Sequence, residues 1–145
     1  MLGVLAQHRR VRILGEAAVQ NTLVADLESG LTRLSPTTEI SADDGSASHI
    51  IVLLTGGTLD EGTPCAAEVA RVVVQQERPV LYVYSTAHGW DFGAFYARPD
   101  GPVKAAIGSH EAQVFRPAEA GTADGGYEFE AMVLELLRKM RPAEQ

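Results

Sequence analysis

The chain has little cysteine, little basic charge and no long apolar stretch. Its one cysteine, Cys65, excludes an internal disulfide, which suits a reducing compartment, and we expect a cytoplasmic location. No apolar run approaches the roughly 20 residues that a membrane-spanning helix needs. Hydrophobic residues still make up 46% of the 145 residues, enough for one core, so we expect a single domain over residues 1–145.

Basic residues are outnumbered, with 12 lysines and arginines against 19 acidic residues and a net charge of −7. The one tight basic cluster, residues 8–10 with Arg12, is typical of a solvated face. Nucleic-acid binders usually carry a larger basic patch, so we expect neither nucleic acid nor an anionic membrane as a partner. His88 and His110 lie apart and lack metal-ligand spacing, so we expect no metal site.

Apolar strand-like runs alternate with helical periodicities along the chain. The run at 49–54 is continuously apolar after its first residue, which indicates a strand buried on both faces. The aromatic stretch 85–101 is predicted to be a long loop. The predicted strands are 11–14, 37–41, 49–54, 79–84 and 113–115, and the predicted helices are 19–34, 63–76, 102–107 and a last amphipathic one around 129–140. This order predicts a parallel sheet covered on both faces.

Ligands of such folds bind at the carboxyl ends of the strands, where the loops 15–17, 55–68 and 85–101 should open. Gly56 and Gly57 would allow close approach of the backbone to a ligand. Thr63 and Pro64 then give a helix start whose free N–H groups favour phosphate. A plain tight turn after a buried strand is the alternative for this loop.

Glu68 lies on the second turn of that predicted helix, among small and apolar neighbours. A glutamate facing a cleft there can hold a ribose hydroxyl or stabilise an oxocarbenium ion. A solvated glutamate near a helix N-terminus is the alternative. Trp90, in the aromatic loop, would either stack on a base or close over the sheet edge. Cys65 is predicted to be a buried cysteine of the same helix.

Three segments resemble the middle of a TIR domain. The strand Ile50–Thr55 is followed by Pro64–Glu68, which is similar to the Trp-Cys-x-x-Glu motif of that family, and the next strand opens with Arg78–Val80. The aromatic loop, the short strand and the closing helix extend the resemblance to about residue 140. It implies a flavodoxin-like three-layer α/β/α fold, with a five-stranded parallel sheet in the order 2-1-3-4-5.

The resemblance also implies a function. In the enzymatic TIR domains the motif glutamate cleaves NAD at the nicotinamide–ribose bond, and here that residue is Glu68. NAD would then be a substrate rather than a bound cofactor, and a homo-oligomer or a TIR-type protein would be the macromolecular partner. The residues expected to bind the nucleotide are Gly15, Glu16, Thr55, Gly56, Gly57 and Trp90.

Two alternatives remain open. Asp60–Glu68 is similar to the Asp-x-Gly-Thr-x-x-Glu of nucleoside 2-deoxyribosyltransferases, and Thr55–Glu61 is similar to a motif of LOG-type phosphoribohydrolases, so a nucleoside or nucleotide N-glycosidase or transferase outside the TIR family is one. A non-catalytic TIR-like interaction module is the other. Pro64 in place of tryptophan and the short segment between Ser41 and His49 favour the module.

Overall fold

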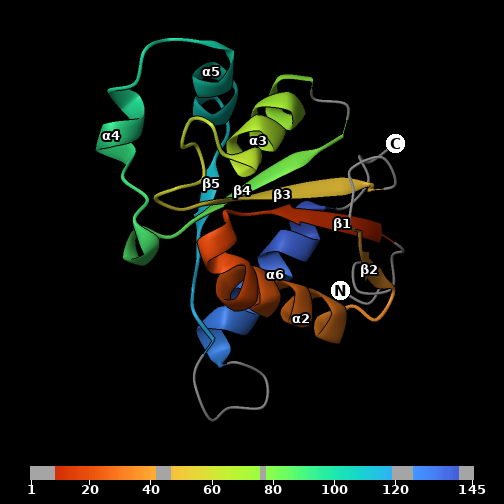
Figure 1. Cartoon of the computed structure of the whole chain (residues 1–145). Coiled ribbons are helices and arrows are strands. Elements are labelled where there is room, and N and C mark those ends of the chain that lie inside the picture. The colour runs from red at the N-terminus through yellow and green to blue at the C-terminus, as the bar shows by residue number, and fades with distance from the viewer. Residues whose placement is uncertain (1–8, 42–46, 76–77, 119–125, 141–145) are drawn as a thin grey trace.

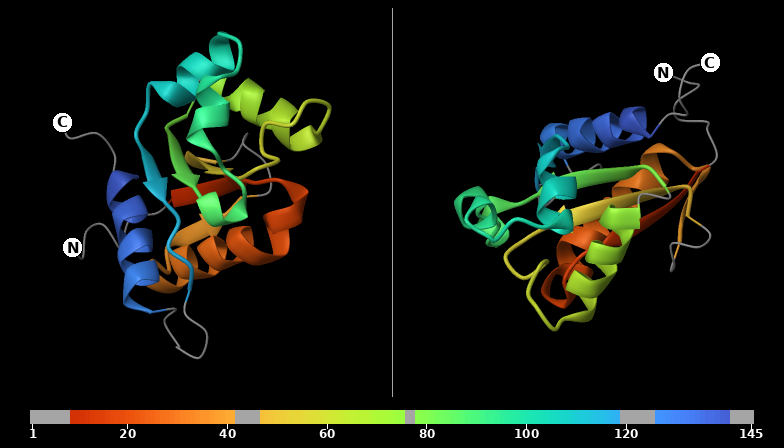
Figure 2. Two further views of the ribbon diagram at one scale, coloured as in Figure 1. Left: turned by 90° about the vertical axis from the view of Figure 1, so that its left-hand side faces the viewer. Right: turned by 90° about the horizontal axis from the view of Figure 1, so that it is seen from above.

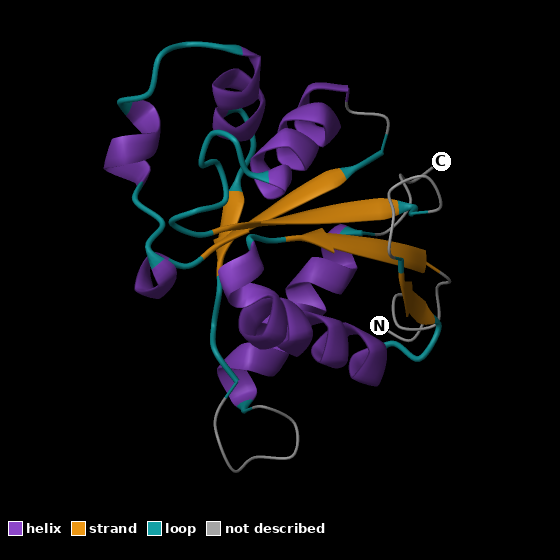
Figure 3. Cartoon of the chain, viewed as in Figure 1, coloured by secondary structure: helices purple, strands orange, loops and turns teal. Residues whose placement is uncertain are grey.

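A five-stranded, all-parallel sheet forms the centre of the protein, in the order β2-β1-β3-β4-β5 (Figures 1 and 3). The structure is a computed structural model, and it describes residues 9–41, 47–75, 78–118 and 126–140. The strands are β1 (Arg9–Leu14), β2 (Thr38–Ile40), β3 (His49–Leu54), β4 (Val80–Tyr84) and β5 (Ala112–Val114). The predicted sheet and its strand order are confirmed.

Helices cover both faces of the sheet, so the fold has the three layers of the flavodoxin-like class (Figure 2). The helices α2 (Ala25–Leu34) and α6 (Tyr127–Lys139) pack against each other on one face. The helices α3 (Pro64–Gln75) and α5 (Pro102–Gly108) pack together on the other. Among the described helices, none is long and apolar enough to cross a bilayer.

The alternation of side chains along β1 and β3 divides the core into two clusters. Ile13 and Leu53 face α2 and α6, whereas Leu14 and Val52 face α3 and α5. Ile51, Val52, Leu53 and Leu54 are all fully buried. The continuous apolar run at 49–54 is thus a strand covered on both sides, as predicted.

Two predicted segments differ in detail. The helix predicted at 19–34 begins earlier, with a 3-10 turn at Ala17–Val19 and a π-helical turn at Gln20–Val24 before α2. The loop predicted at 85–101 contains a 3-10 turn at Thr86–His88 and a short helix, α4 (Phe92–Tyr96). The carboxylate of Asp91 caps α4 by accepting from the N–H of Gly93 at 2.8 Å. Aspartate is a preferred residue at the start of a helix, so the sequence contained a signal for α4, but the aromatic residues of this segment suggested a loop.

The connection between β2 and β3 is unusually short, because β2 ends at Ile40 and β3 begins at His49. A crossover between parallel strands normally takes a dozen or more residues and carries a helix. On the α3 side of the sheet, Arg10 of β1 and Glu39 of β2 form an ion pair at 3.2 Å, and both side chains are more than half exposed. Arg9 differs from the solvated face predicted for its cluster, because it is buried and donates to the hydroxyl of Ser35 at 3.0 Å.

Candidate functional site

A pocket of about 580 Å³ lies at the carboxyl end of β1, between the loop that follows β1 and the start of α3. In the sheet, β1 lies between β2, which follows it in the chain, and β3. The pocket therefore occupies the point where strand order reverses, which is the usual ligand position in open α/β sheets. Its described lining residues include Arg12, Gly15, Glu16, Gln20, Glu28, Gly57, Asp60, Cys65 and Glu68.

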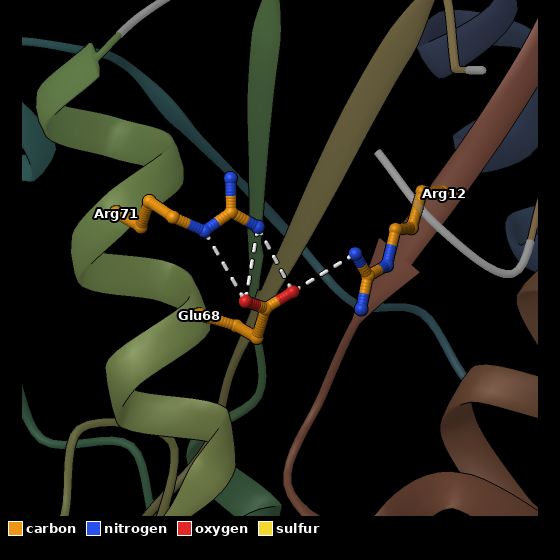
Figure 4. Close-up of polar contacts among 3 residues, drawn as sticks. All are labelled: Arg12, Glu68 and Arg71. Atoms are coloured by element: carbon orange, nitrogen blue, oxygen red, sulfur yellow. Dashed lines mark hydrogen bonds and ion pairs between the residues drawn. The ribbon is translucent and has the colours of Figure 1, made fainter. Parts of the chain in front are cut away.

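Glu68 reaches this pocket because α3 begins where the sequence predicts. The Thr63 hydroxyl accepts from the N–H of Ala66 at 3.2 Å, and Pro64 is the first residue of the helix. The Glu68 carboxylate then lies between two arginines (Figure 4). It pairs with Arg12 of β1 at 2.9 Å, and Arg71 one turn further along α3 donates to both of its oxygens at 2.9 and 3.0 Å.

The ion pair with Arg12 connects α3 to β1 at the pocket wall, whereas the pair with Arg71 lies within α3. The side chain of Glu68 is 34% exposed and that of Arg12 only 18%, so the pair with Arg12 is partly shielded from solvent. The side chain of Arg71 is 38% exposed, and its pair with Glu68 is more easily broken. Glu68 is thus a pocket carboxylate with one firm and one replaceable partner.

Glu16 is the second carboxylate of the pocket, and the loop after β3 holds it. One of its oxygens accepts from the N–H of Gly57 at 2.7 Å and also from the hydroxyl of Thr55. A Cβ at Gly57 would overlap the Glu16 carboxylate, so this position accommodates glycine alone without a shift. Thr55 is buried, is not among the described lining residues, and is hydrogen-bonded to the lining residue Glu16.

The glycine loop does not present free N–H groups to the pocket. The N–H of Gly56 donates to the carbonyl of His88 at 2.9 Å, and that of Gly57 donates to Glu16. Gly56 itself lies against Gly89, whose backbone would be 3.3 Å from a Cβ at position 56. The backbone of this loop therefore approaches other parts of the protein closely, whereas its approach to a ligand stays a prediction.

Trp90 lies apart from this pocket. It is 7% exposed and packs in the core cluster on the α3 side, with its ring beside those of Phe92 and Phe95. Its indole N–H has no hydrogen-bond partner among the residues that the structure describes. Trp90 borders a separate small cavity of about 80 Å³ together with Gly56. The structure thus brings Gly15, Glu16, Gly57 and Glu68 together, and places Gly56 and Trp90 elsewhere.

Cys65 lines the same pocket as Glu16 and Glu68. Burial raises the pKa of its thiol, and the negative charges of Glu16 and Glu68 raise that pKa further. Glu16 belongs to the loop after β1, whereas Cys65 and Glu68 belong to α3. Within the described ranges, no three histidine, cysteine, aspartate or glutamate side chains are grouped so that they could hold a metal ion.

Sequence reasoning missed the arginines of this site. Arg71 follows Glu68 by three residues on one helix, a spacing that favours an ion pair. Arg12 interrupts the apolar residues of β1, and a charged residue inside a strand of a covered sheet indicates a buried partner. Both signals are present in the sequence, but neither identifies the partner by itself.

We expect the ion pair between Arg12 and Glu68 to contribute a coupling free energy of about 0.5–1 kcal/mol, because it is only partly exposed. Urea denaturation of Arg12→Gln, Glu68→Gln and the double variant measures this coupling. The surface pair of Glu135 and Arg138 on α6, with side chains 41% and 50% exposed, is the matched control and should show less. Equal coupling in the two cycles would contradict a structural connection through Glu68.

No protein-family model matches the chain, and no curated protein matches it. The fold and the pocket alone define the class of protein to which this chain belongs. It is a flavodoxin-like α/β protein with a carboxylate-lined pocket at the switch point of its sheet.

Proposed function

We propose that the pocket binds the ribosyl group of a nucleoside or of a nucleotide such as NAD, and that the protein hydrolyses its N-glycosidic bond. The observation that carries this proposal is that Glu16 and Glu68 line one pocket at the switch point of the sheet, together with Cys65. Enzymes that cleave glycosidic bonds generally use a pair of carboxylates beside the bond. The resemblance of Pro64–Glu68 to the TIR motif supports the same residue for the chemistry.

Glu68 would face C1 of the ribose. The bond between C1 and the base nitrogen breaks, and its electron pair goes to the nitrogen. The carboxylate of Glu68 stabilises the positive charge that develops at C1, a water molecule adds to C1, and a proton is released to solvent. Glu16, fixed by Gly57 and Thr55, would accept a hydrogen bond from a ribose hydroxyl.

The two arginines then act on Glu68 rather than on the substrate. Arg12 sets the direction of the carboxylate from β1, and its pair is the better shielded one. Arg71 occupies the side of the carboxylate nearer to solvent, and a substrate would replace it at little cost because that pair is screened. Both arginines are positioning residues in this proposal.

Nicotinamide release from NAD tests the proposal. Wild type should release nicotinamide, and Glu68→Gln should lower the rate by about tenfold or more. Glu61→Gln is the matched control, because Glu61 is exposed and lies outside the pocket lining. Thermal unfolding of both variants shows that they are folded. Release that is equal in wild type and Glu68→Gln, or absent from wild type at high enzyme concentration with both NAD and nicotinamide riboside as substrates, would overturn the proposal.

A non-catalytic binding module is the second candidate, and the saturation of Glu68 by two arginines favours it. In that case Glu68 holds α3 to β1 and never meets a substrate. The aromatic segment would supply the partner surface, where Tyr96 is 56% exposed while Trp90 is buried. This candidate is supported if Glu68→Gln lowers stability, no nucleotide is cleaved, and partner or self-association is lost on Tyr96→Ala.

A further inference from the structure

The charge of the ligand that this pocket accepts follows from how its hydrogen-bond donors are used. A phosphate bound at a loop of this kind needs backbone N–H groups and hydroxyls directed at it. Here the N–H of Gly57 and the hydroxyl of Thr55 both donate to the carboxylate of Glu16. Glu16 thus occupies the position that an anionic ligand would require, and Gly57 lacks the side chain that would prevent this.

The rest of the lining adds to the same preference. Four carboxylates border the pocket, those of Glu16, Glu28, Asp60 and Glu68. Arg12 is the one basic side chain among the described lining residues, and it pairs with Glu68. No ion pair to Glu16, Glu28 or Asp60 occurs within the described part of the chain. The pocket therefore carries a net negative charge, which attracts a cation and repels a phosphate.

The leaving group of the proposed reaction is subject to a related constraint. A neutral base leaves ribose with difficulty unless an acid protonates it, and no histidine, lysine or tyrosine is among the described lining residues. A base that is already a cation needs no acid. When its bond to C1 breaks, the electron pair neutralises the ring nitrogen, and the water that adds to C1 releases one proton.

We propose that the ligand of this pocket is a cationic, unphosphorylated N-riboside, such as a ribosylated pyridinium or a ribosylated, alkylated purine. This inference rests on the proposed function and narrows its substrate class, because phosphorylated ribosides such as NAD would be poor substrates. It gives Glu16 a second role: besides accepting from a ribose hydroxyl, Glu16 excludes phosphate and selects positive charge, whereas Glu68 faces C1 of the sugar.

Alkylation of Cys65 gives a readout of binding that does not depend on turnover, because Cys65 is the only cysteine and lines the pocket. Two ligand pairs each differ in one charged group: nicotinamide riboside and its 5′-monophosphate differ in the phosphate, and 7-methylguanosine and guanosine differ in the positive charge of the base. We expect the cationic, unphosphorylated member of each pair to protect Cys65 from iodoacetamide at about tenfold lower concentration. Equal protection within both pairs, tighter binding of the monophosphate, or no protection by any of the four would overturn the inference.

The Glu16→Gln variant tests the residue that we hold responsible. The amide oxygen can still accept from Gly57 and Thr55, but the charge is gone, so the preference for the cationic members should shrink several-fold. Glu61→Gln removes the same charge outside the pocket and should leave the preference unchanged. An unchanged preference in Glu16→Gln would show that Glu16 does not set it.

The two proposals fail in different ways. Selective protection of Cys65 by cationic ribosides without release of the base would leave the ligand class in place and overturn the hydrolysis. Release of nicotinamide from the 5′-monophosphate or NAD as fast as from nicotinamide riboside, measured below saturation, would support the hydrolysis and overturn the ligand class.

Discussion

Thr58→Val should lower the free energy of unfolding by about 2–4 kcal/mol, although the two side chains have nearly the same shape. Thr58 is fully buried at the turn that follows β3. Its hydroxyl donates to the carbonyl of Leu53 at 2.8 Å and accepts from the N–H of Thr55 at 2.8 Å. Valine would leave both backbone groups buried without a partner, which costs more than the hydrogen bonds themselves contribute.

The same substitution should weaken the pocket. The hydroxyls of Thr58 and Thr55 are 3.1 Å apart, and Thr55 in turn donates to Glu16. A loosened Thr55 would allow Glu16 to move, so any selectivity that depends on Glu16 should fall together with stability. In the loop after β3, hydrogen bonds thus connect the end of that buried strand, through Thr58 and Thr55, to the carboxylate of Glu16.

Urea denaturation of Thr58→Val and of Thr32→Val separates this loop from the general effect of losing a hydroxyl. The Thr32 hydroxyl donates to the carbonyl of Glu28 at 2.9 Å within α2. A carbonyl inside a helix also accepts the helix's own N–H, so Thr32→Val should change the free energy of unfolding by less than about 0.5 kcal/mol. A loss of similar size in both variants would contradict the role of Thr58.

The sheet could be predicted from the sequence because its signals are local and agree with one another. The apolar run at 49–54 predicts a covered strand, and Thr63-Pro64 predicts the start of α3. The missed helix α4 also had a local signal, Asp91 as its N-cap residue, but the aromatic residues suggested a loop. Strand order followed from the family resemblance, and the structure confirms it.

The candidate site could be predicted only in part. Gly15, Glu16, Gly57 and Glu68 share a pocket because the carboxyl ends of parallel strands meet at one edge of a sheet. That rule does not say which way each residue of a loop faces. Gly56 faces Gly89 of the next loop, and Trp90 turns into the core, through contacts between segments distant in sequence. The partners of Glu16 and Glu68 depend on such contacts too.

Gly30→Ala should lower the free energy of unfolding by about 1–2 kcal/mol, although alanine is the better helix former. Gly30 lies in α2, where α6 crosses it. A Cβ there would be 2.9 Å from the ring of Phe129 and 3.0 Å from Val133. Both of these side chains are buried, so the two helices would have to separate. The strain exceeds the gain in helix propensity of about 1 kcal/mol.

Gly108→Ala, at the end of α5, is the matched control for this crossing. A Cβ at position 108 would meet Tyr96 and Phe95 at 3.8 and 3.9 Å, which are ordinary contacts. There the gain in helix propensity is opposed by no strain, so stability should be equal or higher. Thermal unfolding of the two variants compares them directly. If Gly30→Ala proved stabilising, α2 and α6 would have to lie farther apart than they do in this structure. The core on that face of the sheet would then be less tightly packed.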